Sequence, residues 1–114
     1  MTAWHSTGGS DSVAHTWTTA WEKGTQAFRL YRAATTDRAA ATLVAEVGAT
    51  GTANAGSSYA YTDAGLAAGT YYYWLVELTD DGTEAQIAGP RAVVVGGSAL
   101  TVKVRVFIPI SIRR

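Results

Sequence analysis

The sequence predicts an all-β protein that folds as an antiparallel sandwich of about seven short strands, with an extra strand at the C-terminus. Apolar and polar residues alternate along most of the chain, and this is the period of a half-buried strand. Turn-forming residues separate the alternating segments about every dozen positions, a spacing typical of sandwiches and barrels. No segment has the period of a helix longer than one turn.

Composition narrows the classes of function. The chain has 114 residues, of which 47% are apolar and 16% charged, so it can bury one hydrophobic core without stabilising crosslinks such as disulfides. It contains no cysteine, which excludes disulfides, thiolate metal sites and thiol nucleophiles. Nine basic residues balance nine acidic ones, so the chain lacks the excess of positive charge that is typical of nucleic-acid-binding proteins. No run approaches the roughly 18 apolar residues of a membrane span.

The first third of the chain predicts three strands. A weak edge strand is expected near residues 2–6, ahead of a glycine loop. Strict alternation predicts the second strand over residues 12–19 and the third over residues 26–33. Residues 22–25 form the turn between them, because this segment is polar and contains a glycine.

Two loops are expected in the middle of the chain. Residues 34–41 are rich in alanine, but so short a segment is marginal as a helix, and alternation resumes in a strand over residues 42–47. Residues 48–57 are nearly all small and include three glycines. Nothing in this second loop can anchor to a core, so we expect it to be mobile.

The last strands of the sandwich surround a tight hairpin. A short strand at residues 59–63 and a corner at residues 64–69 precede the strongest strand, residues 70–79. Asp81–Gly82 is the residue pair that a two-residue type I′ turn requires, because both of its positions need φ above zero. The remaining strands of this domain, residues 1–97, are expected at 83–87 and, after an interruption at Gly89–Pro90, at 91–95.

Residues 98–114 form a separate amphipathic strand or tail. Its apolar residues occupy every second position, and Pro109 predicts an edge or a bend there. An apolar row on an unpaired strand must be covered, so we favour docking on the domain, either in cis or exchanged in a homodimer. The alternative is a sorting or anchoring tail. The predicted assembly strand consists of Leu100, Val102, Val104, Val106, Ile108 and Ile110.

Three segments resemble bacterial fibronectin type III domains, in the same order and at the right spacing: HTWTTAWEKGTQAFRLYRA, SYAYTDAGLAAGTYYYWL and GPRAVVV. The resemblance spans about residues 12–95 and implies an immunoglobulin-like sandwich in which the third and sixth strands are neighbours. It implies that Trp17 is buried at the end of the second strand. It also implies that Leu66 plugs a corner, Gly69 makes its turn, and Tyr72 is the corner tyrosine, with its hydroxyl bonded to backbone. His15 departs from the family, which has an aliphatic residue there.

The residues predict no enzyme, cofactor or metal site. Only His5 and His15 could act as imidazole bases, and neither lies near an Asp or Ser in a recognisable motif. His15 alternates with apolar residues, so we expect it inside the domain with its ring nitrogens satisfied. Asp80, Asp81 and Glu84 lack the spacing of a calcium loop, and the hairpin explains them.

An aromatic face is the candidate binding surface. If the sixth strand turns Tyr72, Trp74 and the alternate residues that follow toward the core, the residues between them face outward. With the neighbouring third strand they would form an exposed patch that contacts protein or sugar, or rings that simply cover the sheet. The patch consists of Arg29, Tyr31, Tyr71, Tyr73 and Leu75.

The function expected from these features is a non-catalytic accessory module of an exported or surface bacterial protein. It would act as a spacer, in adhesion, or in contact with a protein or polysaccharide surface; nucleic acid is not an expected partner. Met1 is not followed by a signal segment, so we expect any signal to lie outside this sequence. The alternative is an assembly or surface-sorting domain that acts through residues 98–114.

Overall fold

The computed structural model describes residues 2–96, which form seven β-strands and one short 3₁₀ turn. The all-β sandwich predicted from the sequence is confirmed, and no α-helix occurs within these residues. The elements are β1 (Ala3–Gly8), β2 (Ser12–Thr18), β3 (Thr25–Ala33), η1 (Arg38–Ala40), β4 (Thr42–Gly48), β5 (Ser58–Ala64), β6 (Gly69–Thr79) and β7 (Glu84–Val95).

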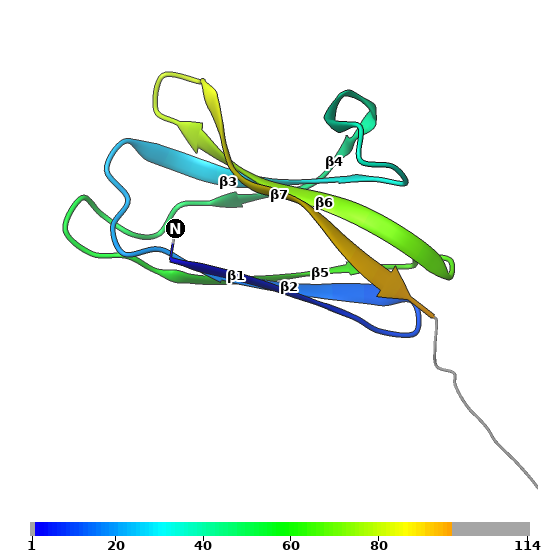
Figure 1. Cartoon of the computed structure of the whole chain (residues 1–114). Helices are drawn as coiled ribbons and strands as arrows, with labels where there is room; N and C mark the ends of the chain where they lie inside the picture. The colour runs from blue at the N-terminus through cyan, green and yellow to red at the C-terminus, as the bar shows by residue number, and fades with distance from the viewer. Residues whose placement is uncertain (1, 97–114) are drawn as a thin grey trace, which may run out of the picture.

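The strands make two antiparallel sheets that lie face to face (Figure 1). One sheet has the order β1-β2-β5 and the other the order β4-β3-β6-β7. The expected neighbours β3 and β6 are paired, with Leu30 opposite Leu75. Side chains from the facing surfaces of the two sheets form the core between them.

The core between the sheets is largely aromatic. Trp17 of β2 stacks on Tyr59 of β5, with ring centroids 5.4 Å apart, and both rings pack on Phe28 of β3. The two sheets thus meet through interlocked rings that carry large buried areas. The other core side chains are Trp4, Val13, Leu30, Leu66, Tyr73, Leu75, Val93 and Val95.

The prediction of which β6 residues point into the core was wrong, because the inward-facing positions are shifted by one residue. Tyr73 and Leu75 are 0% exposed and point into the core, whereas Trp74 and Val76 are buried on the opposite face of the sheet. There they form a second cluster, covered by partly buried side chains that include Tyr31 and Tyr72. Both faces of β6 are apolar, so alternation alone could not decide which face points inward.

The tyrosine corner uses Tyr71, not the predicted Tyr72. The Tyr71 hydroxyl donates a hydrogen bond of 2.7 Å to the carbonyl of Ala67, four residues earlier. Leu66 is buried beside this corner, as expected, and its amide donates to the carbonyl of Asp11 at 2.8 Å. Gly69 begins β6 with φ of +156°, a conformation that favours glycine.

The β6–β7 hairpin has a three-residue loop, so the prediction of a two-residue type I′ turn was wrong. The Gly82 amide donates to the Thr79 carbonyl at 3.0 Å, and the Thr79 amide donates to the Thr83 carbonyl at 2.9 Å. The Asp81 carboxylate accepts from the Thr79 hydroxyl and from the Thr83 amide at 3.0 Å. These bonds close the loop with the required positive φ, +84°, supplied by Gly82.

Two further sequence predictions concern the C-terminal assembly strand and membrane-spanning segments. The predicted assembly strand from Leu100 to Ile110 lies outside the described residues. Within residues 2–96, no helix is long and apolar enough to cross a membrane.

Candidate binding cleft

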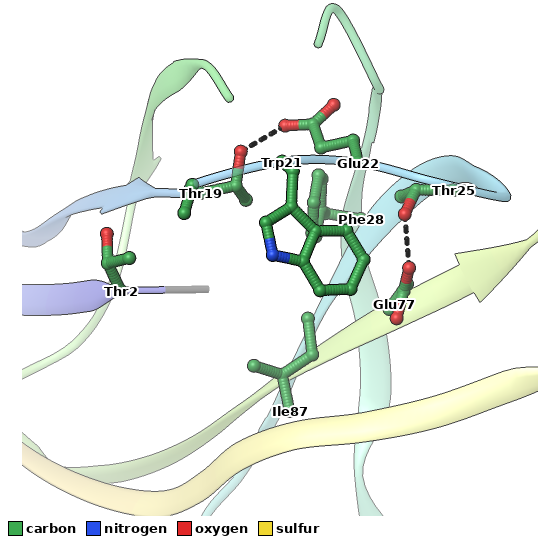
Figure 2. Close-up of a pocket in the computed structure, with 9 residues that line it drawn as sticks. Thr2, Thr19, Trp21, Glu22, Thr25, Phe28, Glu77 and Ile87 are labelled. Atoms are coloured by element: carbon green, nitrogen blue, oxygen red, sulfur yellow. Dashed lines mark hydrogen bonds between the residues drawn. The ribbon is translucent and has the colours of Figure 1, made fainter. Parts of the chain in front are cut away.

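A cleft of about 330 Å³ opens at the end of the sandwich where β1 and β3 begin and β2 and β6 end. Figure 2 shows the indole of Trp21 standing between Thr2 and Thr19 on one side and Thr25 and Glu77 on the other. The volume of the cleft falls within the range of ligand-binding sites in proteins. The complete lining is Thr2, Thr19, Ala20, Trp21, Glu22, Thr25, Phe28, Glu77 and Ile87.

Trp21 is the exposed tryptophan of this protein. Its side chain is 61% exposed, whereas Trp4, Trp17 and Trp74 are all buried. An indole carries one of the largest apolar surfaces of any side chain, and leaving it in water forgoes the free energy of burying it. Large exposed rings at the rim of a cleft are therefore typical of contact sites.

Glu22 fixes the backbone that carries Trp21. Its buried carboxylate accepts hydrogen bonds from the Thr19 hydroxyl at 2.5 Å, the Tyr59 hydroxyl at 2.6 Å and the Gly51 amide at 2.8 Å. Burial alone would raise the pKa of Glu22, but these hydrogen bonds outweigh it and leave the pKa below its ordinary value. The carboxylate is thus charged at neutral pH and has its oxygens occupied.

Residues 48–57 are anchored by Glu22, through both its carboxylate and its backbone amide, and by Tyr59, so the expectation that nothing could anchor this loop was wrong. The Glu22 amide donates to the Thr52 carbonyl at 2.6 Å, and the Thr50 amide donates to the Tyr59 hydroxyl at 2.9 Å. Gly56 lies so close to Thr19, just after β2, that a Cβ atom there would stand 1.7 Å from the Thr19 carbonyl oxygen. The anchors are polar, and small-residue composition does not reveal them.

Glu77 supplies the open acceptor of the cleft. The Thr25 hydroxyl donates to its Oε2 atom, as the dashed line in Figure 2 shows. Its Oε1 atom has no hydrogen-bond partner within residues 2–96, and the side chain is partly exposed. The cleft therefore combines an indole, a free carboxylate oxygen and a second carboxylate that its neighbours already satisfy.

The predicted aromatic face does not exist as one patch. Tyr73 and Leu75 are in the core, and Tyr71 turns inward at the corner. Arg29 and Tyr31 do lie on the outer face of β3, where a charged network engages them. Arg29 bonds Glu46 and Glu84 at 2.7 Å each, Tyr31 also donates to Glu84, and the Arg38 guanidinium lies 3.9 Å from the Tyr31 ring centroid.

His15 lies in the core, as predicted, with 1% exposure. Its Nδ1 atom is 2.8 Å from the Ser6 hydroxyl, but Nε2 has no hydrogen-bond partner within the described residues. The expectation that both ring nitrogens are satisfied was therefore half wrong. Burial lowers the pKa of His15 to about 4, an effect that the charge of Asp63 opposes and that of Arg91 reinforces.

The acidic residues of the hairpin are held by other partners. The Asp81 carboxylate bonds within the turn, and Glu84 accepts from Arg29 and Tyr31. Across residues 2–96, no group of three or more His, Asp or Glu side chains is arranged to hold a metal ion.

Comparison with known proteins adds one likeness of fold. No protein-family model matches the chain, and no curated protein matches it. Among solved structures, it resembles the crystal structure of pectate lyase Pel3 from Pectobacterium carotovorum, with a TM-score of 0.56 and 16% identity. The match covers 86% of this chain but 28% of that one. At this identity it shows the fold alone, a two-sheet β architecture.

Trp21 is a candidate site residue that the sequence did not predict. Trp21 falls between the predicted second strand and the predicted turn at residues 22–25, so it was not part of any alternating strand pattern. An aromatic side chain in a polar turn segment, three residues before Gly24, was the available signal. Glu77 was expected to face outward with the aromatic patch, but the shift in β6 brings it to the cleft instead.

Proposed function

We propose that this domain is a non-catalytic accessory module of an exported or surface-attached bacterial protein and that it binds a partner through the Trp21 cleft. The observation that carries the proposal is an exposed indole on a fixed backbone, beside a cleft of ligand size. The bacterial and exported setting rests on the resemblance to fibronectin type III domains. The likeness to a part of a longer protein agrees with a module that works within a larger chain.

Two features support the fibronectin type III-like part of the proposal. The β3–β6 pairing is the neighbour relation that the resemblance implies. A tyrosine corner is present, although it uses Tyr71 instead of Tyr72. Both features lie within the segment that carries the resemblance in sequence.

The chemistry of the available groups supports a role without catalysis. Hydrolysis by paired carboxylates requires both groups to face the substrate, but three donors occupy the Glu22 carboxylate. Glu77 is then a lone carboxylate. The buried ring of His15 does not line the cleft, so no imidazole base accompanies it.

A retention experiment tests the proposal. Trp21→Ala and Leu43→Ala each remove an exposed apolar side chain, 61% and 51% exposed, but only the first lines the cleft. We expect Trp21→Ala to weaken binding to an immobilised protein or polysaccharide ligand roughly 10-fold or more, as removal of a central aromatic contact does. Leu43→Ala should bind like the parent protein.

The readout is affinity electrophoresis or surface retention against a panel of neutral polysaccharides, acidic polysaccharides and proteins. If Trp21→Ala binds every retained ligand as tightly as the parent, the contact role is rejected and only a spacer role remains. Release of reducing sugar from any panel member would instead reject the non-catalytic assignment.

A further inference from the structure

The described part of the domain is acidic, and the cleft is acidic in particular. All nine Asp and Glu residues of the chain lie within residues 2–96, whereas four of its nine Lys and Arg residues lie beyond them, leaving five basic against nine acidic side chains. That difference is a net charge of −4. Among the nine residues that line the cleft, Glu22 and Glu77 are charged and none is Lys, Arg or His.

This charge selects against an acidic ligand. Glu22 is ionised at neutral pH because its hydrogen bonds hold its pKa below the ordinary value. A uronate or a phosphate in the cleft would therefore approach two carboxylates, and none of the residues that line the cleft has a cationic side chain. A cation would meet the open oxygen of Glu77 and the electron-rich face of the indole.

Contacts elsewhere in the domain indicate which cation suits a site made of an aromatic ring and a carboxylate. The Arg38 guanidinium lies over the Tyr31 ring and 3.7 Å from Glu84, and Arg32 lies 5.8 Å from the Tyr71 ring centroid while bonding Asp63 at 2.6 Å. In each case one arginine serves an aromatic ring and a carboxylate together. Arg91 likewise lies 4.2 Å from the Trp4 ring centroid while donating to its carbonyl. Trp21 with Glu77 has the ring and the carboxylate, but no arginine lines their cleft.

We infer that the cleft binds an arginine side chain of a protein partner, with the guanidinium stacked on Trp21 and hydrogen-bonded to Glu77 Oε1. This inference rests on the proposed binding function and names its ligand. Arginine fits better than lysine because its planar, weakly hydrated guanidinium can stack on a ring while its edge donates to a carboxylate.

The test uses the full chain and two probes that differ in charge but hardly in shape, N-acetylarginine amide and N-acetylcitrulline amide. The readout is the indole N–H signal of Trp21 in a nitrogen–proton correlation spectrum, assigned by its loss in Trp21→Phe. We expect the arginine probe to shift this signal with a dissociation constant of roughly 1–10 mM, a weak affinity appropriate to a single side chain. The neutral citrulline probe should leave the signal in place.

Two variants separate the cleft carboxylate from general charge. Glu77→Gln keeps an oxygen for the Thr25 hydroxyl but should raise the dissociation constant about 5-fold. Glu46→Gln removes the same charge from β4, where Glu46 pairs with Arg29 on the outer face of the sheet. It should change the dissociation constant less than 2-fold, because Glu46 does not line the cleft. Equal effects of the two variants would overturn the role of Glu77.

The remaining outcomes distinguish failure of the ligand from failure of the site. Equal shifts with citrulline, or tighter binding of galacturonate, would overturn the arginine assignment and leave a Trp21 binding site in place. If the arginine probe binds only after Lys103, Arg105, Arg113 and Arg114 are changed to Gln, the chain's own basic segment occupies the cleft and a separate partner is rejected. No ligand-dependent shift, together with unchanged retention of Trp21→Ala, would reject the proposed function as well.

Discussion

Acidification should destabilise this domain through one buried imidazole. His15 has an ordinary pKa of 6.5 in the unfolded chain, and burial lowers it to about 4 in the folded domain. Between these two values the unfolded state binds a proton that the folded state does not. The free energy of unfolding therefore falls as the pH drops from 6.5 to 4, by about 3 kcal/mol in total. Such a loss is a large part of the stability of a domain this size.

A matched variant isolates this effect. His15→Leu introduces an apolar side chain of similar size that cannot titrate. Acid effects from carboxylates other than Asp63, whose charge interacts with His15, are common to both proteins and cancel in the difference. Urea unfolding at pH 7 and pH 4.5 measures each free energy of unfolding. We expect the parent to lose about 2 kcal/mol more than the variant over this interval. A difference that stays constant within about 0.5 kcal/mol would refute the assignment of the pKa shift to a buried neutral imidazole.

Three further predictions follow from other positions. Glu22→Gln should lower the free energy of urea unfolding by about 2–3 kcal/mol, because its three hydrogen-bond donors lose their charged acceptor and one of its oxygens becomes an amide nitrogen that cannot accept. The folded-state pKa of Glu22 is below its ordinary 4.5, so the stabilisation by the carboxylate is present above that pH and is lost as the pH falls through the folded-state value. Gly56→Ala should lower the free energy of unfolding by at least about 2 kcal/mol, because the new Cβ meets the Thr19 carbonyl. Gly48→Ala, where nothing lies within 4 Å of the new Cβ, should change the free energy of unfolding by less than about 1 kcal/mol. Equal melting temperatures of the two variants would contradict this prediction. Removal of residues 98–114 should lower either the mass in solution or the melting temperature if that segment docks as the sequence predicts, and identical values by light scattering and calorimetry would rule out docking.

The strand pattern of the domain could be read from sequence because local alternation determines it. Val13, His15 and Trp17 of β2 alternate with exposed residues, and all three are buried as expected. The β1-β2-β5 sheet has one face in water along this strand, so the exposed positions mark the outside. The same local signal placed β3 correctly, whereas its pairing with β6 was expected from the family resemblance.

The face of β6 could not be read in this way, because it has no polar side. Its central run from Tyr71 to Val76 is entirely apolar or aromatic. Tyr71, Tyr73 and Leu75 pack toward the core between the sheets, whereas Trp74 and Val76 are buried on the outer face, where Tyr31 and Tyr72 pack against them. Such a run is compatible with either orientation. The long-range contacts of Ala33 and Trp74 on the outer face decide it, and a short window of sequence does not contain them.

The cleft depends on contacts between residues that are far apart in sequence. Glu22 reaches Gly51 and Tyr59, which are 29 and 37 positions away, and these bonds were invisible to local patterns. Glu77 meets Thr25 across 52 positions. Carboxylates on a polar turn and at the end of a strand are ordinarily solvated, so neither residue stood out by type alone.

The adjacency of Trp21 and Glu22 separates binding from stability on two neighbouring residues. Glu22 points inward and fixes the backbone through three donors, whereas the Trp21 ring points into the cleft and is largely exposed. Truncating Trp21 removes little buried surface, so it should weaken binding while the free energy of unfolding stays nearly unchanged. Loosening Glu22 should affect both, because a ring that must be ordered at the moment of binding carries an entropic cost that a fixed ring has already met. A cleft built on this principle can present an indole to a partner without drawing it into the core.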